Sequence, residues 1–123
     1  MSQTESHEMY LKAIYRIHAR QGYVRNIDIA GELGISKPSV TNALERLRKS
    51  GDIEIEDNHV ILTEIGKERA EKIIMRYDTL VEMLTFMDIP RDKAEEVACK
   101  MEHILDDETF YGVKIWLRKQ KMA

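Results

Sequence analysis

The sequence predicts a mainly α fold that begins with a winged helix-turn-helix and continues into an α-helical domain. Three observations indicate this fold. Apolar residues recur at helical spacing over most of the 123 residues. A glycine at position 34 separates two short helical patterns, which is typical of a helix-turn-helix. Apolar and polar residues then alternate over residues 53–62, as they do in a β-hairpin.

The first two helices are expected near the N-terminal end. Residues 6–20 form a mostly apolar helical pattern, with Ser6 placed to cap it and Gly22 placed to end it. Asn26 is expected to cap a short second helix, and Gly34 makes the turn that closes it.

The third helix is expected to start at Ser36, a residue type that caps helices well, and to stop at Gly51. Pro38 is tolerated in its first turn, because the N–H that proline lacks would have no helical partner there. The buried stripe of this helix is expected at Val40, Ala43, Leu44 and Leu47.

The expected hairpin, with its turn at residues 56–59, is the wing of a winged helix. Thr63 then caps a long helix over residues 64–86. Asp92 is expected to cap a fifth helix, and a last helix covers residues 108–119.

The chain is expected to form two domains, the winged helix at 1–63 and a helical domain at 64–123. The second domain carries more apolar surface than its short helices can bury alone, so it is expected to pair with a second copy as a homodimer. The apolar residues concerned are Ile89, Val97, Ile104, Val113, Ile115, Trp116 and Leu117.

Composition narrows the class of protein. The formal net charge of −3 argues against a protein that binds nucleic acid everywhere on its surface. One cysteine cannot form an internal disulfide, which indicates a reducing compartment, the cytoplasm. No apolar run approaches the roughly 20 residues of a membrane span, and no signal peptide is visible, so no membrane partner is expected.

The third helix has the composition of a DNA-reading helix. Its start carries small polar groups that can contact base edges, and Pro38 can contact a thymine methyl. Its far end is basic, as phosphate contact requires, although basic residues there also suit the helix dipole. The predicted contacts to double-stranded DNA are Ser36, Lys37, Pro38, Ser39, Thr41, Asn42, Arg46, Arg48 and Lys49.

The only cysteine belongs to a group of metal-ligand types. Cys99, Glu102 and His103 are spaced i, i+3 and i+4, which on a helix places them on one face. A thiolate, a carboxylate and an imidazole together suit a divalent transition metal. At least one further ligand must come from elsewhere. A buried cysteine beside a solvated Glu-His pair would give the same pattern.

A catalytic reading of Cys99 and His103, as nucleophile and base, finds no third orienting residue and no oxyanion loop in the sequence. No enzyme is therefore predicted.

Four stretches complete the interpretation: residues 8–15 (EMYLKAIY), 35–41 (ISKPSVT), 62–66 (LTEIG) and 99–103 (CKMEH). Together they resemble the diphtheria-toxin-repressor family of metal-dependent transcription regulators, including its shorter manganese-transport-regulator branch. The likeness covers nearly the whole chain. It implies a metal-loaded dimer that binds a palindromic operator, with repression of metal-uptake genes as the family expectation. Longer members continue into an SH3-like domain, so the resemblance is to the short form.

The resemblance also implies a primary metal site made of Met9, Cys99, Glu102 and His103. Under this resemblance, residues 64–123 are the dimerisation and metal-binding domain. The thioether and thiolate resemble the iron-regulating branch, whereas the manganese branch has carboxylates at the positions of Met9 and Cys99. Softer ligands favour Fe²⁺ over Mn²⁺, so Fe²⁺ is the first expected cofactor and Mn²⁺ the second.

An ancillary metal site is implied at Asp78, Glu82 and Glu95, where the family has His, Glu and His. A solvated acidic face would show the same residues. Lys12 stands where the manganese branch has a carboxylate ligand, so a binuclear arrangement is not expected.

The alternative function is a winged-helix regulator that acts without metal or senses oxidants through Cys99. The operator sequence, the regulated genes and the physiological metal stay open at this stage.

Overall fold

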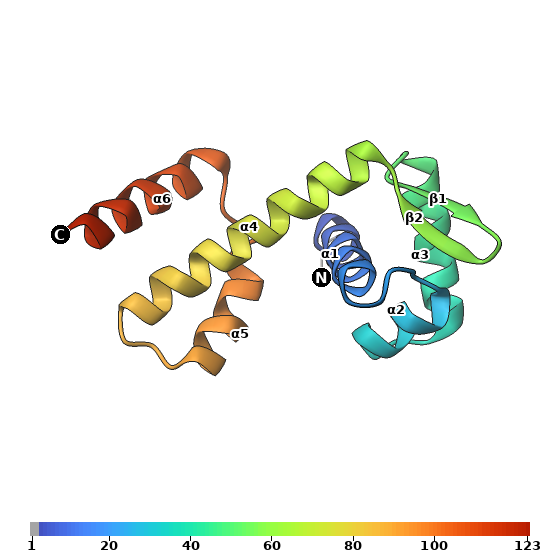
Figure 1. Cartoon of the computed structure of the whole chain (residues 1–123), viewed down its shortest axis with the longest axis horizontal. Helices are drawn as coiled ribbons and strands as arrows, with labels where there is room; N and C mark the ends of the chain where they lie inside the picture. The colour runs from blue at the N-terminus through green and yellow to red at the C-terminus, as the bar shows by residue number, and fades with distance from the viewer. Residues whose placement is uncertain (1–2) are drawn as a thin grey trace. The chain divides into compact units, whose positions relative to one another are not determined.

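The computed structural model describes residues 3–123, and within them helices dominate, so the mainly α class is confirmed (Figure 1). The elements are α1 (Gln3–Gln21), α2 (Asn26–Leu33), α3 (Lys37–Lys49), β1 (Ile53–Glu56), β2 (His59–Leu62), α4 (Glu64–Phe86), α5 (Arg91–Met101) and α6 (Asp107–Met122).

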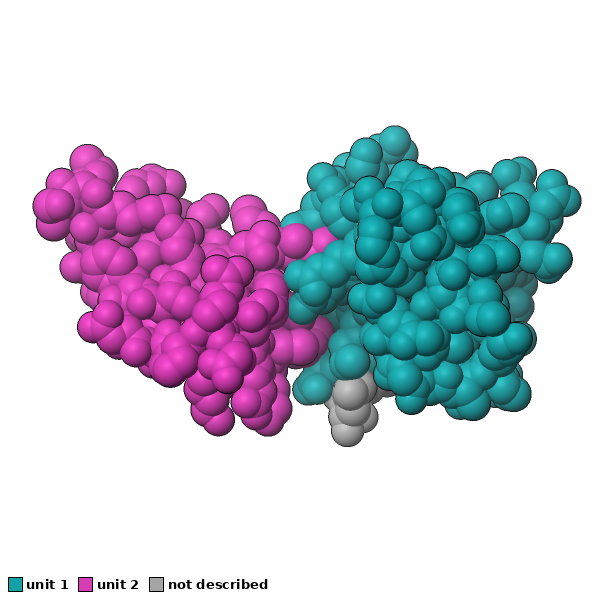
Figure 2. All heavy atoms as spheres, turned by 60° about the horizontal axis from the view of Figure 1, so that its bottom comes forward, with its two compact units in different colours: residues 1–72 teal, residues 73–123 magenta. Residues whose placement is uncertain are grey.

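The chain divides into two compact units, residues 1–72 and 73–123, which Figure 2 shows in different colours. The first, unit 1, contains α1, α2, α3 and the hairpin. The second, unit 2, contains α5 and α6. The division falls within α4, so this helix contributes residues to both units.

Unit 1 is built around one apolar core that draws on each of its elements. The side chains with 0% exposure in this core are Ile14, Ile17, Val24, Ile29, Val40 and Ala70. The expected buried stripe of α3 is confirmed at all four positions. Because α3 buries that stripe, its opposite face is left to solvent.

The wing is a two-stranded antiparallel hairpin with Ile53 opposite Leu62 and Glu56 opposite His59. Asp57 (φ 48°) and the following asparagine (φ 65°) both adopt left-handed conformations, as a two-residue turn of this hand requires. The hairpin gains a further backbone contact, because the N–H of Val60 donates to the carbonyl of Val24 at 2.8 Å. The segment before α2 thus supports the wing.

Unit 2 has its own core, formed by Leu80, Val81 and Leu84 of α4 with Ala94 and Ala98 of α5. The alanines are fully buried, and their small side chains allow α5 to lie close to α4.

A buried arginine ties α4 to the connection that precedes α6. Arg76 donates to the carbonyl of Leu105 at 2.6 Å and forms an ion pair with Asp107. Its guanidinium also lies 5.1 Å from the ring centre of Phe110. This arginine therefore fixes where α6 begins.

Two predicted helix caps, Ser36 and Thr63, are confirmed. Ser36 accepts the N–H of Ser39 at 3.3 Å, and Thr63 accepts the N–H of Gly66 at 3.1 Å. Asp106 caps α6 by accepting the N–H of Thr109 at 2.7 Å, so this helix starts one residue before the expected boundary. Hydrogen bonds from the hydroxyl and N–H of Thr109 lower the pKa of Asp106.

Three other predicted caps are wrong. Ser6 lies inside α1, which starts three residues earlier with Glu5 in its first turn, where an acidic residue complements the helix dipole. The N-cap of α2 is Arg25, because Asp28 accepts its backbone N–H at 2.9 Å.

The side chain of Asn26, the expected cap of α2, instead donates to the hydroxyl of Thr41 at 2.8 Å. Asp92 lies in the first turn of α5, whose cap is Pro90; the carbonyl of that proline accepts the N–H of Ala94 at 2.8 Å.

We expect Gly66→Ala to destabilise the fold, because an added Cβ would lie 2.0 Å from the backbone oxygen of Asp52. Backbone cannot move aside as a flexible side chain can, so the loss of unfolding free energy should be about 1–3 kcal/mol or more. Urea unfolding at fixed protein concentration measures it.

Gly31→Ala is the matched control within the same unit, because an added Cβ meets nothing within 4 Å. This change should raise stability by up to about 1 kcal/mol. Equal effects of the two substitutions would contradict the close approach at Gly66.

Candidate functional site

The helix-turn-helix is closed by a left-handed glycine. Gly34 has φ 67° and ψ 36°, and the N–H of Ile35 that follows donates back to the carbonyl of Ala30 at 3.1 Å. This geometry ends α2 and turns the chain so that α3 starts at Lys37. The predicted helix, glycine turn and helix are therefore present.

All nine predicted DNA contacts are exposed. Four of them are spaced by four, four and three residues, which places them on one face of α3. They are Pro38, Asn42, Arg46 and Lys49, and we call this set the α3 stripe. It lies opposite the buried stripe, so it is the part of α3 that faces away from the core.

The hydroxyl groups at the start of α3 are engaged within the protein. The hydroxyl of Ser36 donates to that of Ser39 at 2.9 Å. Thr41 donates to the carbonyl of Lys37 at 3.0 Å and accepts from Asn26. Sequence reasoning missed this role of Asn26, because the hydrogen bond joins residues of two helices that are 15 positions apart in the chain. These hydroxyls therefore have structural bonds whatever they contact outside.

The basic end of α3 is partly neutralised. Arg48 donates from Nε to Glu45 at 3.1 Å, and the hydrogen bond lowers the pKa of that carboxyl. Arg46 is close enough to Tyr10 of α1 for its charge to oppose the rise that burial causes in the pKa of that tyrosine. Glu45 pairs with Arg48, so the positive charge at this end of α3 comes from Arg46 and Lys49 in the α3 stripe.

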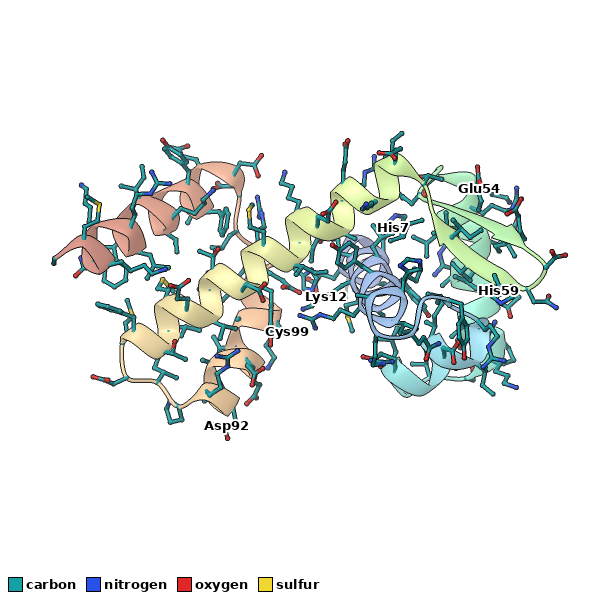
Figure 3. The ribbon with its side chains drawn as sticks, in the orientation of Figure 1. His7, Lys12, Glu54, His59, Asp92 and Cys99 are labelled. Carbon is teal, nitrogen blue, oxygen red and sulfur yellow. The ribbon has the colours of Figure 1, made fainter. Side chains whose placement is uncertain are left out.

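The wing is acidic. Glu54, Glu56 and Asp57 are exposed on it (Glu54 and His59 are labelled in Figure 3), and no lysine or arginine occurs from residue 50 to residue 66. Phosphates repel carboxylates, so the wing is less suited to contact with a DNA backbone than the basic end of α3 is. The charge of the hairpin is visible in the sequence as well as its alternation.

The predicted metal ligands lie on both units. Met9 is a half-buried residue of α1 in unit 1. Cys99 is a half-buried, free cysteine on α5 in unit 2 (Figure 3). The side chains of Glu102 and His103 are 0% and 4% exposed, and Oε1 of Glu102 lies 3.3 Å from Nε2 of His103.

The expectation that Cys99, Glu102 and His103 share one helix is wrong. The helix ends at Met101, and Glu102 is its C-cap. The N–H of His103 then donates to the carbonyl of Lys100 at 3.4 Å, a tighter turn than an α-helix makes. The bond from Arg76 to the carbonyl at 105 holds the chain in this turn.

Within residues 3–123, no group of three or more histidine, cysteine, aspartate or glutamate side chains is arranged to hold a metal. Within unit 2, the structure therefore brings Glu102 and His103 together but does not arrange Cys99 with them as a metal site. The primary site stays a prediction.

The predicted ancillary residues have other contacts. Glu82 forms an ion pair with Lys121, and Glu95 accepts the hydroxyl of Tyr77 at 3.3 Å. Asp78 is exposed. This site also stays a prediction.

None of the helices in the part of the chain that the structure describes has the length and apolar character to cross a membrane.

Comparisons with known proteins match both parts of the chain. The model of the iron-dependent repressor N-terminal DNA-binding domain matches residues 2–59. The model of the iron-dependent repressor metal-binding and dimerisation domain matches residues 63–117.

Individual relatives agree. An HTH-type transcriptional regulator of Methanocaldococcus jannaschii is 33% identical over 121 residues, which are 96% of this chain and 97% of the relative. The transcriptional regulator MntR of Escherichia coli is 30% identical over 111 residues, 89% of this chain and 72% of that protein.

A solved manganese-dependent transcriptional repressor, in complex with manganese, matches with a TM-score of 0.82 at 22% identity. The match covers 90% of this chain and 52% of that one, so this chain spans about half its length. This likeness concerns the fold alone.

The two family models and the full-length relative confirm the predicted resemblance and identify a group of DNA-binding repressors rather than enzymes. The chain belongs to the iron-dependent repressor family, the diphtheria-toxin-repressor group of metal-dependent transcriptional regulators.

Proposed function

We propose that this regulator, as a homodimer loaded with a divalent metal, binds a palindromic operator in cytoplasmic DNA and represses genes of metal uptake. Residues 1–63 read the DNA, and residues 64–123 dimerise and supply three of the four metal ligands, the fourth being Met9. The observation that carries the proposal is the α3 stripe, an exposed face with an apolar, an amide and two basic side chains in order.

The order of groups along the α3 stripe suits a duplex. Pro38 and Asn42 come early in the helix, where residues of a recognition helix meet base edges. The amide of Asn42 can donate to and accept from adenine in the major groove. Arg46 and Lys49 come late, where they meet phosphates and set the register.

The donor chemistry of Met9, Cys99, Glu102 and His103 fits a divalent transition metal. Glu102 and His103 are almost fully buried and lie within 3.3 Å of one another, so a cation between them would be shielded from water. Cys99 adds a thiolate from α5 and Met9 a thioether from α1. The proposal requires Cys99, Glu102 and His103 to converge when the metal is loaded.

We place Fe²⁺ first and Mn²⁺ second as the cofactor. Two sulfur ligands among four favour the softer, later metal at equal availability. Cys99 must be a thiolate and His103 neutral to bind it, so metal affinity should fall as the pH falls.

Binding of metal and binding of DNA affect one another's affinity through thermodynamic linkage. A metal stabilises the DNA-binding state only by the difference between its affinities for the two states of the protein. Coupling of this kind is typically about 5–150-fold in affinity. A dimer then presents two copies of α3 to successive major grooves.

The proposal predicts that operator binding at fixed salt requires metal. A titration of a palindromic duplex, first in chelator, then with Fe²⁺ without oxygen, then with Mn²⁺, should show binding about 5–150-fold tighter with metal. Cys99→Ala and His103→Ala should each remove this difference, because each deletes a ligand.

Glu96→Ala is the matched control, since Glu96 is an exposed residue of the same helix as Cys99. It should respond to metal as the natural protein does. Binding of the natural protein that ignores metal, or that is lost only on thiol oxidation, would contradict the proposal and favour a regulator without metal.

The proposal also separates base readout from phosphate contact. Asn42→Ala should reduce discrimination between operator and random DNA by about 1–3 kcal/mol, because it removes a base-edge contact. Lys49→Ala should weaken binding to both DNAs alike and reduce the slope of log affinity against log salt by about 1.

Fluorescence anisotropy on both duplexes across a salt series measures the two quantities together. The two variants serve as controls for one another. Equal losses on operator and random DNA for Asn42→Ala would rule out direct readout by this residue.

A further inference from the structure

One acidic side chain of unit 1 is fully buried at the root of the wing, where α3 has ended and β1 begins. The side chain of Asp52 is 0% exposed. Its Oδ2 accepts from Nε2 of His7 at 2.6 Å and from the hydroxyl of Ser50 at 2.7 Å (His7 is labelled in Figure 3). Arg69 donates to both carboxylate oxygens, at 2.9 and 3.1 Å. One carboxylate is therefore held by α1, the end of α3, and α4.

The backbone of Asp52 is held as firmly as its side chain. Its N–H donates to the carbonyl of Leu47 in α3 at 3.1 Å, and its carbonyl accepts the N–H of Thr63 at 3.0 Å. Gly66 of α4 lies so close to that carbonyl that no Cβ would fit. Movement of Asp52 toward one helix therefore disturbs its bonds to the others.

These bonds differ in kind from the other contacts between α1 and α3. Leu11 of α1 and Leu47 of α3 belong to the same apolar core, but apolar contact is non-directional and permits small shifts. Hydrogen bonds depend on direction as well as distance. Removing one partner of a buried carboxylate also costs free energy, because part of the buried charge is left uncompensated.

His7 and Ser50, the two partners of Asp52 on α1 and at the end of α3, lie next to residues of the proposed metal and DNA sites. His7 lies two residues before Met9 on α1, and Ser50 directly follows Lys49 at the end of the α3 stripe. The geometry points to Asp52 as a positioning residue that couples metal binding on α1 to the placement of the α3 stripe. This inference rests on the proposed function. The route lies wholly within unit 1 and runs from His7 through Asp52 to Ser50.

The quantity that measures this coupling is a ratio. It is the operator dissociation constant in chelator divided by that at saturating metal. A residue that only supports the fold would weaken DNA binding in both conditions and leave the ratio unchanged. A residue that couples the two sites lowers the ratio. By reciprocity, it also lowers the gain in metal affinity that DNA causes, by the same factor.

The experiment compares three histidine variants of the full chain. His7→Ala removes the donor to Asp52 and should lower the ratio at least about fivefold, the lower end of common coupling. His7→Gln keeps an N–H donor and should retain most of the ratio. His18→Ala is the matched control, since His18 is an exposed histidine of the same helix, and it should leave the ratio unchanged.

A second variant tests the carboxylate itself. Asp52→Asn keeps the shape but removes the charge that Arg69 faces, so the ratio should fall at least as far as in His7→Ala. Circular dichroism and the oligomeric state check that each variant is folded. Should Asp52→Asn not fold, the histidine series still decides.

Metal titration without DNA, using Fe²⁺ and Mn²⁺, completes the test. Unchanged metal affinity of His7→Ala, together with a lowered ratio, supports the inference. An unchanged ratio would overturn it and leave the proposed function standing. A loss of metal affinity without DNA would also overturn it, by making His7 part of the metal site. A natural protein with a ratio of one would instead overturn the proposed function.

Discussion

Burial of the Asp52 carboxylate constrains the geometry of unit 1, because a carboxylate removed from solvent needs hydrogen-bond donors at fixed positions. His7, Ser50 and Arg69 supply these donors from parts of the chain that are up to 62 positions apart. Asp52 lies between the end of α3 at Lys49 and the start of β1 at Ile53, and its carbonyl accepts the N–H of Thr63 directly before α4. The geometry of the helix-turn-helix therefore depends on a polar contact as well as on the apolar core.

Charge is distributed unevenly over the surface that this scaffold presents. The acidic wing and the basic end of α3 belong to one unit and carry charges of opposite sign. Of the two, only the basic end of α3 suits the phosphates of DNA, because the hairpin carries carboxylates. The net charge of −3 is compatible with a DNA-binding protein for this reason: a small basic face is enough when it lies on the reading helix.

Local patterns predicted the elements of the fold well and the ends of its helices less well. The α3 stripe, the hairpin and α4 follow from periodicity and from single residues such as Ser36 and Thr63, whose interactions are with near neighbours. Asn26 was expected to cap α2 but bonds to Thr41, because folding offers it a distant partner. The fifth helix was expected to continue through His103, yet it ends at Met101 before the turn that Arg76 holds from another helix.

The sequence by itself determined the fold class, the order of elements, the family and the types of donor available for a metal. Each of these depends on residue type and on spacing within a few turns of the chain. Only the tertiary structure decided which polar groups are already engaged, and that Glu102 and His103 are buried together beyond the end of α5. The reason is physical: burial and hydrogen bonding between distant segments arise only when the chain is packed. No local pattern records them.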